Sequence, residues 1–542
     1  MPPMEYHAAQ GRGSEAKLLH RVPHSFGCSL STLAQPGLFT APCAAPGRRH
    51  LESLGGPMHV MLIEPPKRVW DLMGDCVTPP LGLAWIAAVL EREEGVQVSV
   101  LDCNASEMGW RALRQAIEEQ QPDLVGATAM TPYFPPVVRA MRIAKEVQPR
   151  TVTVLGGHHV TFLAEEALRE HPEVDLVVCG EGERVAIDLV RALAAGRDLA
   201  TVPGIVFRRN GLQTAASSAM RDRGEDVQIV RTPAAEPVDL SALPLPAYHL
   251  LPMSVYRFEF LGNPFAVMQA SRGCPHRCTF CSEWPFWGNW RARPAEAVVE
   301  EISLLSERYH CESVWFGDDC FNMDGEFMAA ICEGILQRGV EINWFYQGRA
   351  DLVVKHKELL PLMRRAGNRM TQIGIESSTE DELADLKKRL SLEQVREAVE
   401  LLKQHDIVGQ GLLIIGTPTD SARSIQHKLR FSKWLDLDFP IFTIYTPFPG
   451  SDAYGDAMAR GWLDRSLNYA HFDMAHVLLP TEHLSIRQVS NLYLWCLNSY
   501  YRDPIKVLRG LFSGGDWKRA VWRHLLAYNL KMQAKTAFRF GR

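Results

Sequence analysis

Three cysteines stand close together in the segment Cys274-Pro275-His276-Arg277-Cys278-Thr279-Phe280-Cys281, with the spacing C-x3-C-x2-C. Three thiolates on one short loop are typical ligands of a metal centre. A structural zinc site normally has four ligands and paired C-x-x-C spacing, and His276 lies inside the loop, where it is poorly placed to supply the fourth. An iron–sulfur cluster held by three cysteines leaves one iron open for another ligand. The segment therefore predicts an iron–sulfur cluster, with zinc and unligated core cysteines as the alternatives.

A regular alternation of strands and helices surrounds this segment. Six strand–helix units predict a partial barrel, whose reactive groups should lie at the carboxyl ends of the strands. Helix starts are also visible: Ser391 and Gln394 form a capping-box pattern, and Pro294 occupies a first-turn position. The predicted strands are Ala266–Ala270, Ser313–Phe316, Ile342–Tyr346, Met370–Ile375, Gly411–Ile415 and Ile441–Tyr445.

Another alternation lies upstream of the cysteines. Five strand–helix units at this spacing predict a doubly wound parallel sheet, with ligand-binding loops at the carboxyl ends of its strands. The predicted strands are His59–Ile63, Val96–Leu101, Leu124–Thr128, Thr151–Leu155 and Asp175–Cys179. The predicted helices are Leu83–Glu93, Trp110–Glu119, Val137–Val147 and Phe162–Glu170.

These patterns divide the chain into five regions. The expected fold class is α/β: a doubly wound domain, then a partial (β/α)6 barrel and a helical C-terminal region. In the linker, Gly204–Phe207 is expected to form a hairpin with Leu212–Ala215. The regions are an extension without regular structure (1–57, with Met58 as an alternative start), the doubly wound domain (58–200), a hairpin and proline-rich linker (201–262), the partial barrel (263–465) and the helical region (466–542).

Composition and charge narrow the class of protein. The 542 residues are 46% hydrophobic and 22% charged, which is typical of a globular, multidomain chain. Twelve cysteines are too few for a disulfide scaffold, so reduced thiols and a cytoplasmic location are expected. The net charge of −5 argues against a general nucleic-acid coat. The charge is strongly polarised along the chain. Residues 501–542 carry ten Lys or Arg and two Asp or Glu, whereas residues 1–500 carry 48 Lys or Arg and 61 Asp or Glu.

The cysteine segment, with aromatic Phe280 before the third cysteine, resembles the signature of the radical S-adenosylmethionine (SAM) family. The resemblance implies a 4Fe–4S cluster on Cys274, Cys278 and Cys281, with SAM bound to the open iron through its amino and carboxylate groups. One-electron reduction would cleave SAM to a 5′-deoxyadenosyl radical that removes hydrogen from the substrate. An electron donor such as flavodoxin or ferredoxin is implied as a partner.

The same resemblance assigns further SAM-binding residues at later strand ends. Asp318 and Asp319 end the second strand, where the family contacts the SAM amino group, and Glu376 matches a carboxylate directed at SAM. Gly416 ends the fifth strand, where glycine permits close backbone approach to adenine. Phe280 completes this set. Taken singly, each strand-end position also fits a helix cap or a tight turn.

The upstream domain resembles the cobalamin-binding domain fused to one branch of that family, the class B radical SAM methyltransferases. The predicted contacts are Asn104, Thr131, Gly156, Gly157, Gly180, Glu181 and Gly182. A dinucleotide site is the rival, but Ile63-Glu64-Pro65-Pro66 stands where its glycine-rich turn would follow the first strand. An empty, vestigial domain is the other alternative.

One motif departs from other cobalamin domains. Domains that bind cobalt through a histidine use D-x-H-x-x-G, whereas the aligned segment Asp102–Glu107 has Asn104 at the histidine position. The branch fused to radical SAM domains commonly lacks this histidine, so we expect cobalt without a protein histidine below it. His158 and His159 are interpreted as loop residues near the cofactor rather than as ligands.

The resemblance implies methyl transfer to carbon: one SAM methylates reduced cobalamin, and a second generates a substrate radical that takes the methyl group. Residues 284–290 and 346–367 resemble hopanoid ring-A methylases, which favours a hydrophobic or lipid substrate. The anaerobic magnesium-protoporphyrin monomethyl ester cyclases share both domains and oxidise their substrate, so they are the alternative. A non-catalytic cobalamin sensor is the alternative from another class.

Aromatic and basic residues alternate near the C-terminus, over residues 493–540. An amphipathic basic helix with aromatic anchors can lie on an anionic membrane surface as a peripheral contact. A terminal helix that packs on the barrel explains the pattern equally well. RNA binding is a third, less favoured interpretation.

Overall fold

The computed structural model describes residues 56–67, 76–209, 228–258, 264–464 and 468–527. All of them belong to one unit that begins at Leu54. The extension expected over residues 1–57 lies outside the described residues, except for its last two positions. The expected strand Leu212–Ala215 and the basic tail beyond residue 527 also lie outside them.

Seven strands form the first sheet, in the order β3-β1-β4-β5-β6-β7-β8. The first five in this order run parallel, as expected, and β1 lies between β3 and β4. Because the chain passes from β1 to β3 on one side and then to β4 on the other, a crevice is expected where these connections diverge. The strands are β1 Met58–Glu64, β3 Val96–Asp102, β4 Leu124–Thr128, β5 Val152–Gly156, β6 Leu176–Val178, β7 Ile205–Arg208 and β8 Ile229–Arg231.

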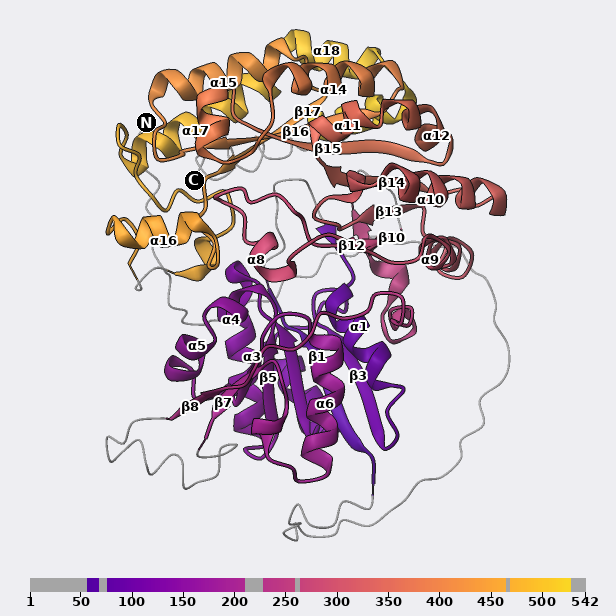
Figure 1. Ribbon diagram of the computed structural model, residues 1–542, viewed down its shortest axis with the longest axis vertical. Helices are drawn as coiled ribbons and strands as arrows, with labels where there is room; N and C mark the ends of the chain where they lie inside the picture. Colours follow the sequence, from indigo (N-terminus) through magenta and orange to yellow (C-terminus); the bar gives the residue numbers. More distant parts are fainter. Residues whose placement is uncertain (1–55, 68–75, 210–227, 259–263, 465–467, 528–542) are drawn as a thin grey trace, which may run out of the picture. The chain divides into compact units, whose positions relative to one another are not determined.

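Helices cover both faces of this sheet (Figure 1). Alternate residues of β1 point to opposite faces: Val60 and Leu62 pack in the core with α1 and α6, whereas Met61 and Ile63 pack in the core with α2 and α3. The helices are α1 Leu81–Leu90, α2 Trp110–Gln120, α3 Phe134–Val147, α4 His158–Phe162, α5 Ala164–Glu170 and α6 Gly182–Ala194.

The first sheet continues into the segment that was expected to be a linker. The strand predicted at Gly204–Phe207 is β7, and it pairs with β8. Its expected partner, Leu212–Ala215, lies outside the described residues. Both pairings of β7, with β6 and with β8, are antiparallel. The two strands therefore extend the parallel sheet by an antiparallel edge.

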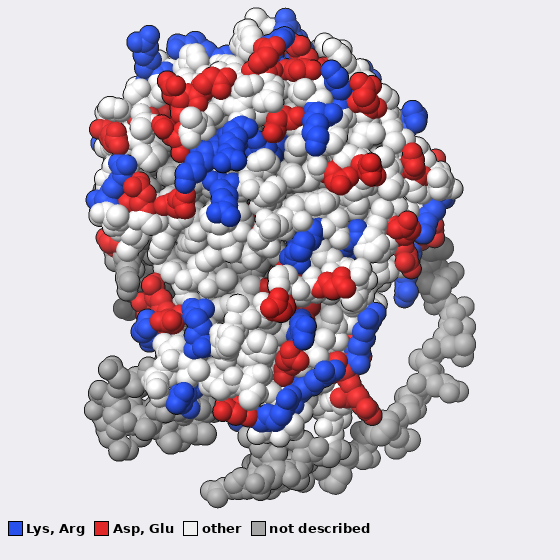
Figure 2. All heavy atoms as spheres, viewed as in Figure 1, with Lys and Arg blue, Asp and Glu red and all other residues white. Residues whose placement is uncertain are grey.

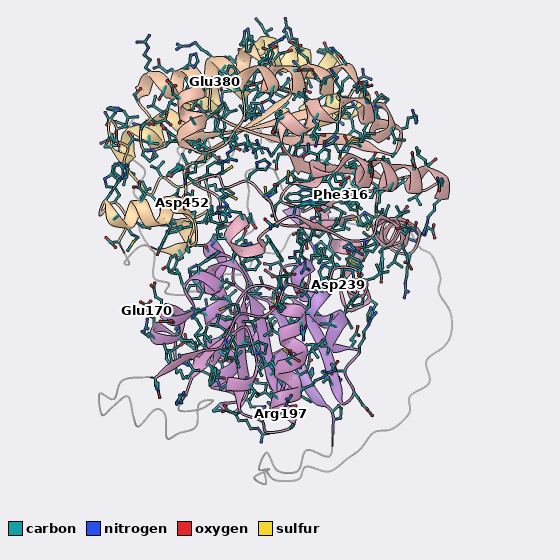
Figure 3. All side chains as sticks on the ribbon, viewed as in Figure 1. Glu170, Arg197, Asp239, Phe316, Glu380 and Asp452 are labelled. Atoms are coloured by element: carbon teal, nitrogen blue, oxygen red, sulfur yellow. The ribbon has the colours of Figure 1, made fainter. Side chains whose placement is uncertain are left out.

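Six parallel strands form the second sheet, in the sequential order β10-β13-β14-β15-β16-β17 of a partial barrel (Figure 1). The bounds of β13 agree with the prediction, and the other five differ by no more than three residues at either end. Phe316, labelled in Figure 3, ends β13. The strands are β10 Phe265–Met268, β13 Ser313–Phe316, β14 Asn343–Gly348, β15 Asn368–Glu376, β16 Val408–Ile415 and β17 Phe439–Ile444.

Helices follow these strands as expected. The capping box of Ser391 and Gln394 is present at the start of α14. Pro294 stands just before α9 rather than inside its first turn. The helices are α9 Ala295–Glu307, α10 Gly325–Arg338, α11 Ala350–Lys355, α12 Leu360–Arg365, α13 Glu380–Asp385, α14 Leu392–Gln404, α15 Ala422–Trp434 and α16 Asp452–Ala459.

Short elements occur in addition to the two main sheets and their helices. Strand β2 (Cys76–Val77) pairs with β9 (Arg257–Phe258), and β11 (Ser271–Arg272) pairs with β12 (Arg291–Ala292). Helix α8 (Glu283–Trp287) follows the cysteine segment. Single 3-10 turns occur at Thr131–Tyr133, Leu199–Thr201, Tyr248–Leu250, Met253–Val255, Phe321–Met323, Lys357–Leu359 and Tyr469–His471.

The described C-terminal region is helical, as predicted: α17 Ile486–Tyr501, α18 Pro504–Phe512 and helical residues 516–527. Part of its aromatic content is buried, because Tyr493, Tyr500 and Trp522 belong to the core of the second sheet. Packing on the barrel therefore explains these three aromatics. In the described ranges, no helix combines the length and apolar character needed to cross a membrane.

Candidate functional site

The three predicted cluster ligands lie on one loop that follows β10 and β11. Cys278 is buried, and Cys274 and Cys281 are half-buried. The backbone of Thr279 anchors the loop, since its N–H donates to the Leu386 carbonyl (3.1 Å) and its carbonyl accepts from the Ala453 N–H (2.9 Å). Phe280 packs against the apolar cluster that contains both anchoring residues. The loop is thus fixed between the segments around α13 and α16.

Two cations lie near the thiols of this loop. A hydrogen bond with the Cys320 thiol lowers the pKa of Cys274 to about 7, although burial acts in the opposite direction. Burial raises the pKa of the other two thiols. At Cys274 and Cys278, Arg349 and Lys388 oppose the effect of burial on the pKa, because positive charge nearby favours a thiolate. They are suitably placed to offset the negative charge of a thiolate-bound cluster.

The donor set fits a cluster better than a single ion. In the part of the chain that the structure describes, no three His, Cys, Asp or Glu side chains converge on one point as ligands of a single metal ion. In a 4Fe–4S cluster each cysteine binds a different iron, so its thiols need not converge in this way. Three free thiols on one anchored loop, beside two cations, match that requirement.

Gly273, just before the first cysteine, allows the loop to approach the chain around residue 289. Its φ of 85° lies in the left-handed region, and a Cβ there would come within 2.5 Å of the Asn289 carbonyl oxygen. The N–H of Gly273 donates to the Asp319 carboxylate (2.9 Å). Asp319, predicted to contact SAM, therefore has a protein partner that sets the direction of the cysteine loop.

Asp318 also has protein partners. Its carboxylate accepts from the N–H groups of Ala270 (3.1 Å) and Ser271 (2.5 Å) and from the Ser271 hydroxyl (2.5 Å). Burial raises the pKa of Asp318 to about 6, although these hydrogen bonds act to lower it. Asp318 is thus hydrogen-bonded to the start of β11, the strand that leads to the cysteines.

Glu376 has an unusual backbone conformation and a buried partner. It ends β15 with a φ of 64°, a region that non-glycine residues occupy at a cost in energy. Its carboxylate accepts from the Lys388 ammonium (2.7 Å), and both side chains are buried. A Cβ at Gly374 would come within 2.2 Å of the Glu376 oxygen, so glycine leaves the space for this pair. Local strain of this kind often marks functional sites.

A buried lysine joins the loops that follow β15 and β16. Gly416 has a φ of 84°, and its N–H donates to Asp420 (2.8 Å). Lys428 donates to Asp420 (2.8 Å) and to Glu382 (2.6 Å), which also accepts from the Ser377 hydroxyl. Lys428 thereby connects the predicted adenine position to the segment after Glu376.

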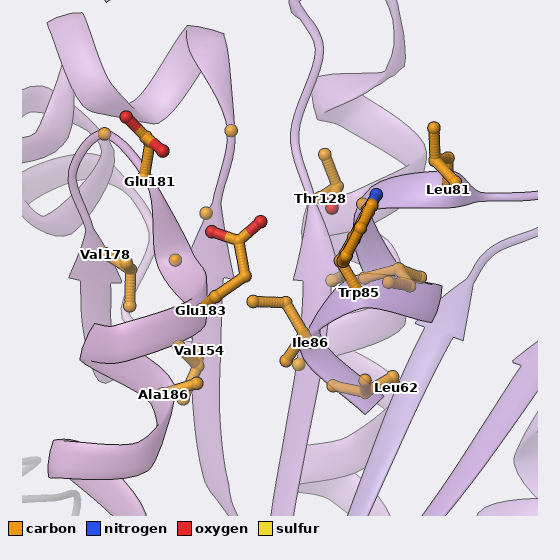
Figure 4. Close-up of a pocket in the computed structure, with 18 of the residues that line it drawn as sticks. Leu62, Leu81, Trp85, Ile86, Thr128, Val154, Val178, Glu181, Glu183 and Ala186 are labelled. Atoms are coloured by element: carbon orange, nitrogen blue, oxygen red, sulfur yellow. The ribbon is translucent and has the colours of Figure 1, made fainter. Parts of the chain in front are cut away.

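A cavity of about 270 Å³ lies in the first domain, between the sheet and helices α1 and α6 (Figure 4). Small residues keep its walls apart: a Cβ on Gly182 would lie 3.0 Å from Ile86, and one on Gly126 would lie 3.0 Å from Leu62. Its mouth carries the Glu181 and Glu183 carboxylates (Figure 4). Apolar wall residues include Leu62, Leu83, Ile86, Val154, Val178, Ala186 and Leu189.

Most of the predicted cobalamin contacts line this cavity: Gly156, Gly157, Gly180, Glu181 and Gly182. Asn104 does not, because its amide joins two loops by accepting from the Lys67 N–H (3.0 Å) and donating to the Pro65 carbonyl (3.0 Å). Thr131 is also absent from the lining, and its hydroxyl faces the His159 ring (3.4 Å).

The two loop histidines have different surroundings. His158 lines the cavity, and its Nε2 is 2.7 Å from the Glu283 carboxylate. His159 is buried between the rings of Phe134 and Tyr469. Burial lowers the pKa of His159 to about 3, so the ring is neutral.

The apolar wall of the cavity was not predicted from the sequence. Leu83 and Ile86 of α1 and Ala186 and Leu189 of α6 have the same character as core residues, so hydrophobicity alone does not distinguish them. One feature of the sequence could have indicated the cavity: the small residue Gly182 at the first position of α6 is followed one turn later by Ala186. Small residues on one helix face leave room for a ligand.

Arg272 links the cavity to the cysteine loop. Its guanidinium donates to Glu181 (2.8 Å) and to Glu183 (2.5 Å), and all three side chains are buried. The same group lies over the Trp287 ring, 4.9 Å from its centroid. Since Arg272 is two residues before Cys274, the predicted cobalamin loop and the predicted cluster loop contact each other directly.

A second link follows the third cysteine. Glu283 accepts from the Trp287 indole (3.1 Å) and contacts His158. The His158 ring stacks on Phe286, with centroids 3.7 Å apart and planes 15° apart. The cysteine loop is thus attached to the first domain at both of its ends.

Comparison with known proteins agrees with this geometry. Residues 75–190 match the model of the B12 binding domain, and residues 268–431 match that of the Radical SAM superfamily. An uncharacterized methyltransferase of Pyrococcus horikoshii is 32% identical over 479 residues, which cover 87% of this chain and 99% of the relative. The chain belongs to the cobalamin-binding radical SAM family.

Other relatives in this family differ in their named reactions. The anaerobic magnesium-protoporphyrin IX monomethyl ester cyclase of Rubrivivax gelatinosus is 29% identical over 78% of this chain and 79% of the relative. The hopanoid C-3 methylase of Methylococcus capsulatus is 28% identical over 84% of each chain. The radical SAM methyltransferase TsrM from Kitasatospora setae shares the fold, with a TM-score of 0.66 and 18% identity over 88% of this chain and all of that one.

Family membership confirms several predictions. The chain is an enzyme of the cobalamin-dependent radical SAM methyltransferase family, and the sensor alternative is not supported. Its cofactors are those of the two matched domains: cobalamin, SAM and a 4Fe–4S cluster. The fold class is confirmed as well.

Proposed function

We propose that the protein methylates an unactivated carbon of a hydrophobic substrate, and that a hopanoid-type lipid is the favoured substrate. The observation that carries this proposal is the direct contact between the cysteine loop and the mouth of the cavity, through Arg272 and its two glutamates. A reaction that combines a carbon radical with a methyl group on cobalt requires both cofactors to face one substrate. Contact between their loops meets that requirement.

Each cofactor has a matching set of residues. We assign the cluster to Cys274, Cys278 and Cys281, SAM to the region of Glu376 and Gly416, and cobalamin to the cavity mouth. When bound, the cluster and SAM supply a carbon radical, and cobalamin supplies the methyl group. Lys388 neutralises the buried Glu376 carboxylate, and Lys428 holds the two SAM loops together. The aromatic side chains beside Arg272 exclude water from the contact.

Aromatic residues near the cysteines support a hydrophobic substrate. Helix α8 carries Trp284, Phe286 and Trp287, all half-buried. Figure 2 shows few charged side chains around the place where α8 lies in Figure 1. A lipid or a large ring system binds to such a surface by burying apolar area. A hydrophobic substrate is also consistent with the similarity to the hopanoid C-3 methylase, whose named substrate is a hopanoid.

The test is an anaerobic reaction of reconstituted protein with SAM that carries a deuterated methyl group. We expect a hopanoid to gain one labelled methyl group, detected by mass spectrometry, together with 5′-deoxyadenosine. Cys278→Ala should abolish both products and the visible absorbance of the cluster. Cys332→Ala, in the α10 core, is the matched control and should retain them. Absence of 5′-deoxyadenosine from the wild type would contradict the enzyme assignment.

The oxidative cyclase is the second candidate, because a cyclase relative is as similar as the hopanoid methylase. The same reconstituted protein should be offered magnesium-protoporphyrin monomethyl ester. Formation of the additional ring without transfer of the label would favour the cyclase. Labelled hopanoid and unchanged porphyrin would favour the methylase.

We further propose that α18 makes peripheral contact with an anionic membrane. Ile505, Leu508 and Phe512 are 62%, 57% and 76% exposed and lie on one helix face. The last 42 residues have a net charge of +8, which complements anionic lipid. A lipid substrate would then be taken from the surface on which the enzyme rests.

A further inference from the structure

A hollow of about 580 Å³ lies on the outer side of the cysteine loop. One side consists of Pro275, His276 and Arg277, which lie between the first two cysteines. The other side consists of α13 and the residues that follow it, to Leu390. The hollow is therefore formed by the same two segments that supply the predicted cluster ligands and Lys388.

Basic side chains dominate the hollow. Arg277, Lys387 and Arg389 are exposed. Among the described residues, the Arg389 side chain has no ion-pair partner, whereas Lys387 pairs with Asp452 (2.9 Å). The one carboxylate among the lining residues that the structure describes is that of Glu380, which accepts from the Leu392 N–H (2.9 Å) and offsets only part of this positive charge. The hollow thus presents net positive charge to solvent.

The backbone directs these bases outward. Lys387 and Arg389 have φ values of 51° and 49°, both in the left-handed region, and Lys388 between them points inward to Glu376. Three consecutive basic residues therefore face alternately outward, inward and outward. Such a backbone is costly for non-glycine residues, and here it separates surface charge from the charge of the site.

We propose that this basic hollow, defined by Arg277, Lys387 and Arg389, is the docking surface for an acidic one-electron donor protein. The inference rests on the proposed function, because SAM cleavage at the cluster needs an electron from outside. The donor is a reduced flavoprotein of flavodoxin type. Its flavin hydroquinone gives one electron and becomes the semiquinone, while the cluster passes from the 2+ to the 1+ state.

The position favours electron transfer, which slows steeply with distance. A partner in the hollow touches residues that lie between two cluster ligands. The two ends of the cysteine loop are already in contact with the first domain, through Arg272 and Glu283. The hollow is the exposed face of this loop.

The chemistry of the surface favours a charged and transient partner. Electron-transfer complexes have small interfaces, and complementary charge accelerates their formation more than it strengthens them. A hollow with exposed bases at its rim suits such an encounter. An obligate partner would instead require a large apolar surface.

The test measures cluster reduction by stopped-flow absorbance, with fully reduced flavodoxin in excess and no substrate. Arg277→Glu/Arg389→Glu should lower the second-order rate constant about tenfold or more at about 0.01 M salt, where charges are weakly screened. The difference should shrink at about 0.15 M salt. Because Arg277 adjoins Cys278, Lys387→Glu/Arg389→Glu provides a second variant outside the loop.

The matched control is Arg111→Glu/Arg197→Glu, which makes the same change in net charge at exposed positions of the first domain. Figure 3 labels Arg197 and Glu380 at opposite ends of the drawn face. This control should be reduced at the wild-type rate. Photoreduction with 5-deazariboflavin, a small uncharged donor, should reduce the cluster equally in all proteins.

The outcomes separate the inference from the proposed function. Equal rates with flavodoxin in the wild type and both charge-reversal variants would overturn the docking surface. A wild-type cluster that deazaflavin reduces without SAM cleavage would instead contradict the proposed function. An equal loss of rate with both donors would also overturn the inference, because the substitutions would then act on the cluster itself.

Discussion

Lys388 forms a buried ion pair with Glu376, the carboxylate predicted to contact SAM. It is buried, yet its pKa is raised: burial is the largest single effect and acts to lower the pKa, but the charges of Glu376 and Cys278 and the hydrogen bond with Glu376 together outweigh it. The pair closes the space that Gly374 leaves open. A buried ion pair of this kind fixes the positions of its two side chains but adds little net stability, because the cost of desolvating both charges offsets much of their attraction.

Breaking this pair from one side should be costly. Lys388→Met leaves the Glu376 carboxylate buried without a partner, so we expect a loss of about 3–5 kcal/mol in the free energy of unfolding. Urea denaturation monitored by circular dichroism measures it. The double variant Glu376→Gln/Lys388→Met removes both charges and should recover most of the loss. A double variant as unstable as Lys388→Met would contradict the explanation.

His159 should make stability depend on pH. Its folded-state pKa of about 3 lies below the usual 6.5, so the folded state binds the proton more weakly than the unfolded state does. Stability from this group is complete above pH 6.5 and declines as the pH falls, by about 2 kcal/mol at pH 5. His159→Phe keeps a ring between Phe134 and Tyr469 and should reduce the difference between urea curves at pH 7 and pH 5 by that amount. Identical pH dependence in both proteins would contradict the prediction.

At the scale of elements, α1 and α6 leave room for the cavity because α6 begins with Gly182 and carries Ala186 one turn later. Gly182→Val should place two methyl groups where the helix faces Ile86, and thereby obstruct the cavity. We expect cobalamin binding, measured by equilibrium dialysis, to weaken at least tenfold, while the circular dichroism spectrum is unchanged. Gly109→Val, at an open position before α2, is the matched control and should bind normally. Normal binding by Gly182→Val would contradict the assignment of the cavity.

Local pattern was sufficient to predict most of the elements. The parallel strands have apolar cores bounded by turns, and β4 and β13 begin and end where the pattern predicts. The pairing of β7 with β8 was harder to predict from the sequence, because β8 has three residues and is joined to β7 by a long connection. Pairing over such a distance leaves no periodic signal.

The candidate site was predictable in part. Cysteine spacing and glycine-rich strand ends reflect backbone requirements, so Cys274 and Gly157 could be recognised from sequence. Asn104 and Asp318 could not be placed in the same way, because the direction of a polar side chain depends on donors from distant segments. The basic hollow likewise requires two segments that are far apart in the chain.

For the whole molecule, the C-terminal helices have two distinct surfaces. Tyr500 and Trp522 are buried on the barrel, whereas Ile505, Leu508 and Phe512 are exposed. Deleting residues 501–542 would therefore uncover the core as well as remove the proposed membrane contact. Substitution of the three exposed residues separates the two effects.

We expect Ile505→Ser/Leu508→Ser/Phe512→Ser to lose flotation with phosphatidylglycerol vesicles, because each buried apolar side chain contributes about 1.5–3 kcal/mol. Neutral phosphatidylcholine vesicles should bind the wild type more weakly. Leu336→Ser, at an exposed apolar position of α10, is the control and should float normally. Equal flotation of the triple variant would contradict membrane contact, and a change only in gel-filtration size would indicate self-association instead.

The link from Arg272 to Glu181 and Glu183 has a consequence for chimeric enzymes. A domain boundary drawn through the linker would separate an arginine from its two carboxylates, leaving buried charge on each side of the junction. A cobalamin domain grafted from another lineage will therefore function in this chain only if it brings acidic residues at both positions. The two modules are therefore not freely interchangeable, because Arg272 and its two glutamates must match across the junction.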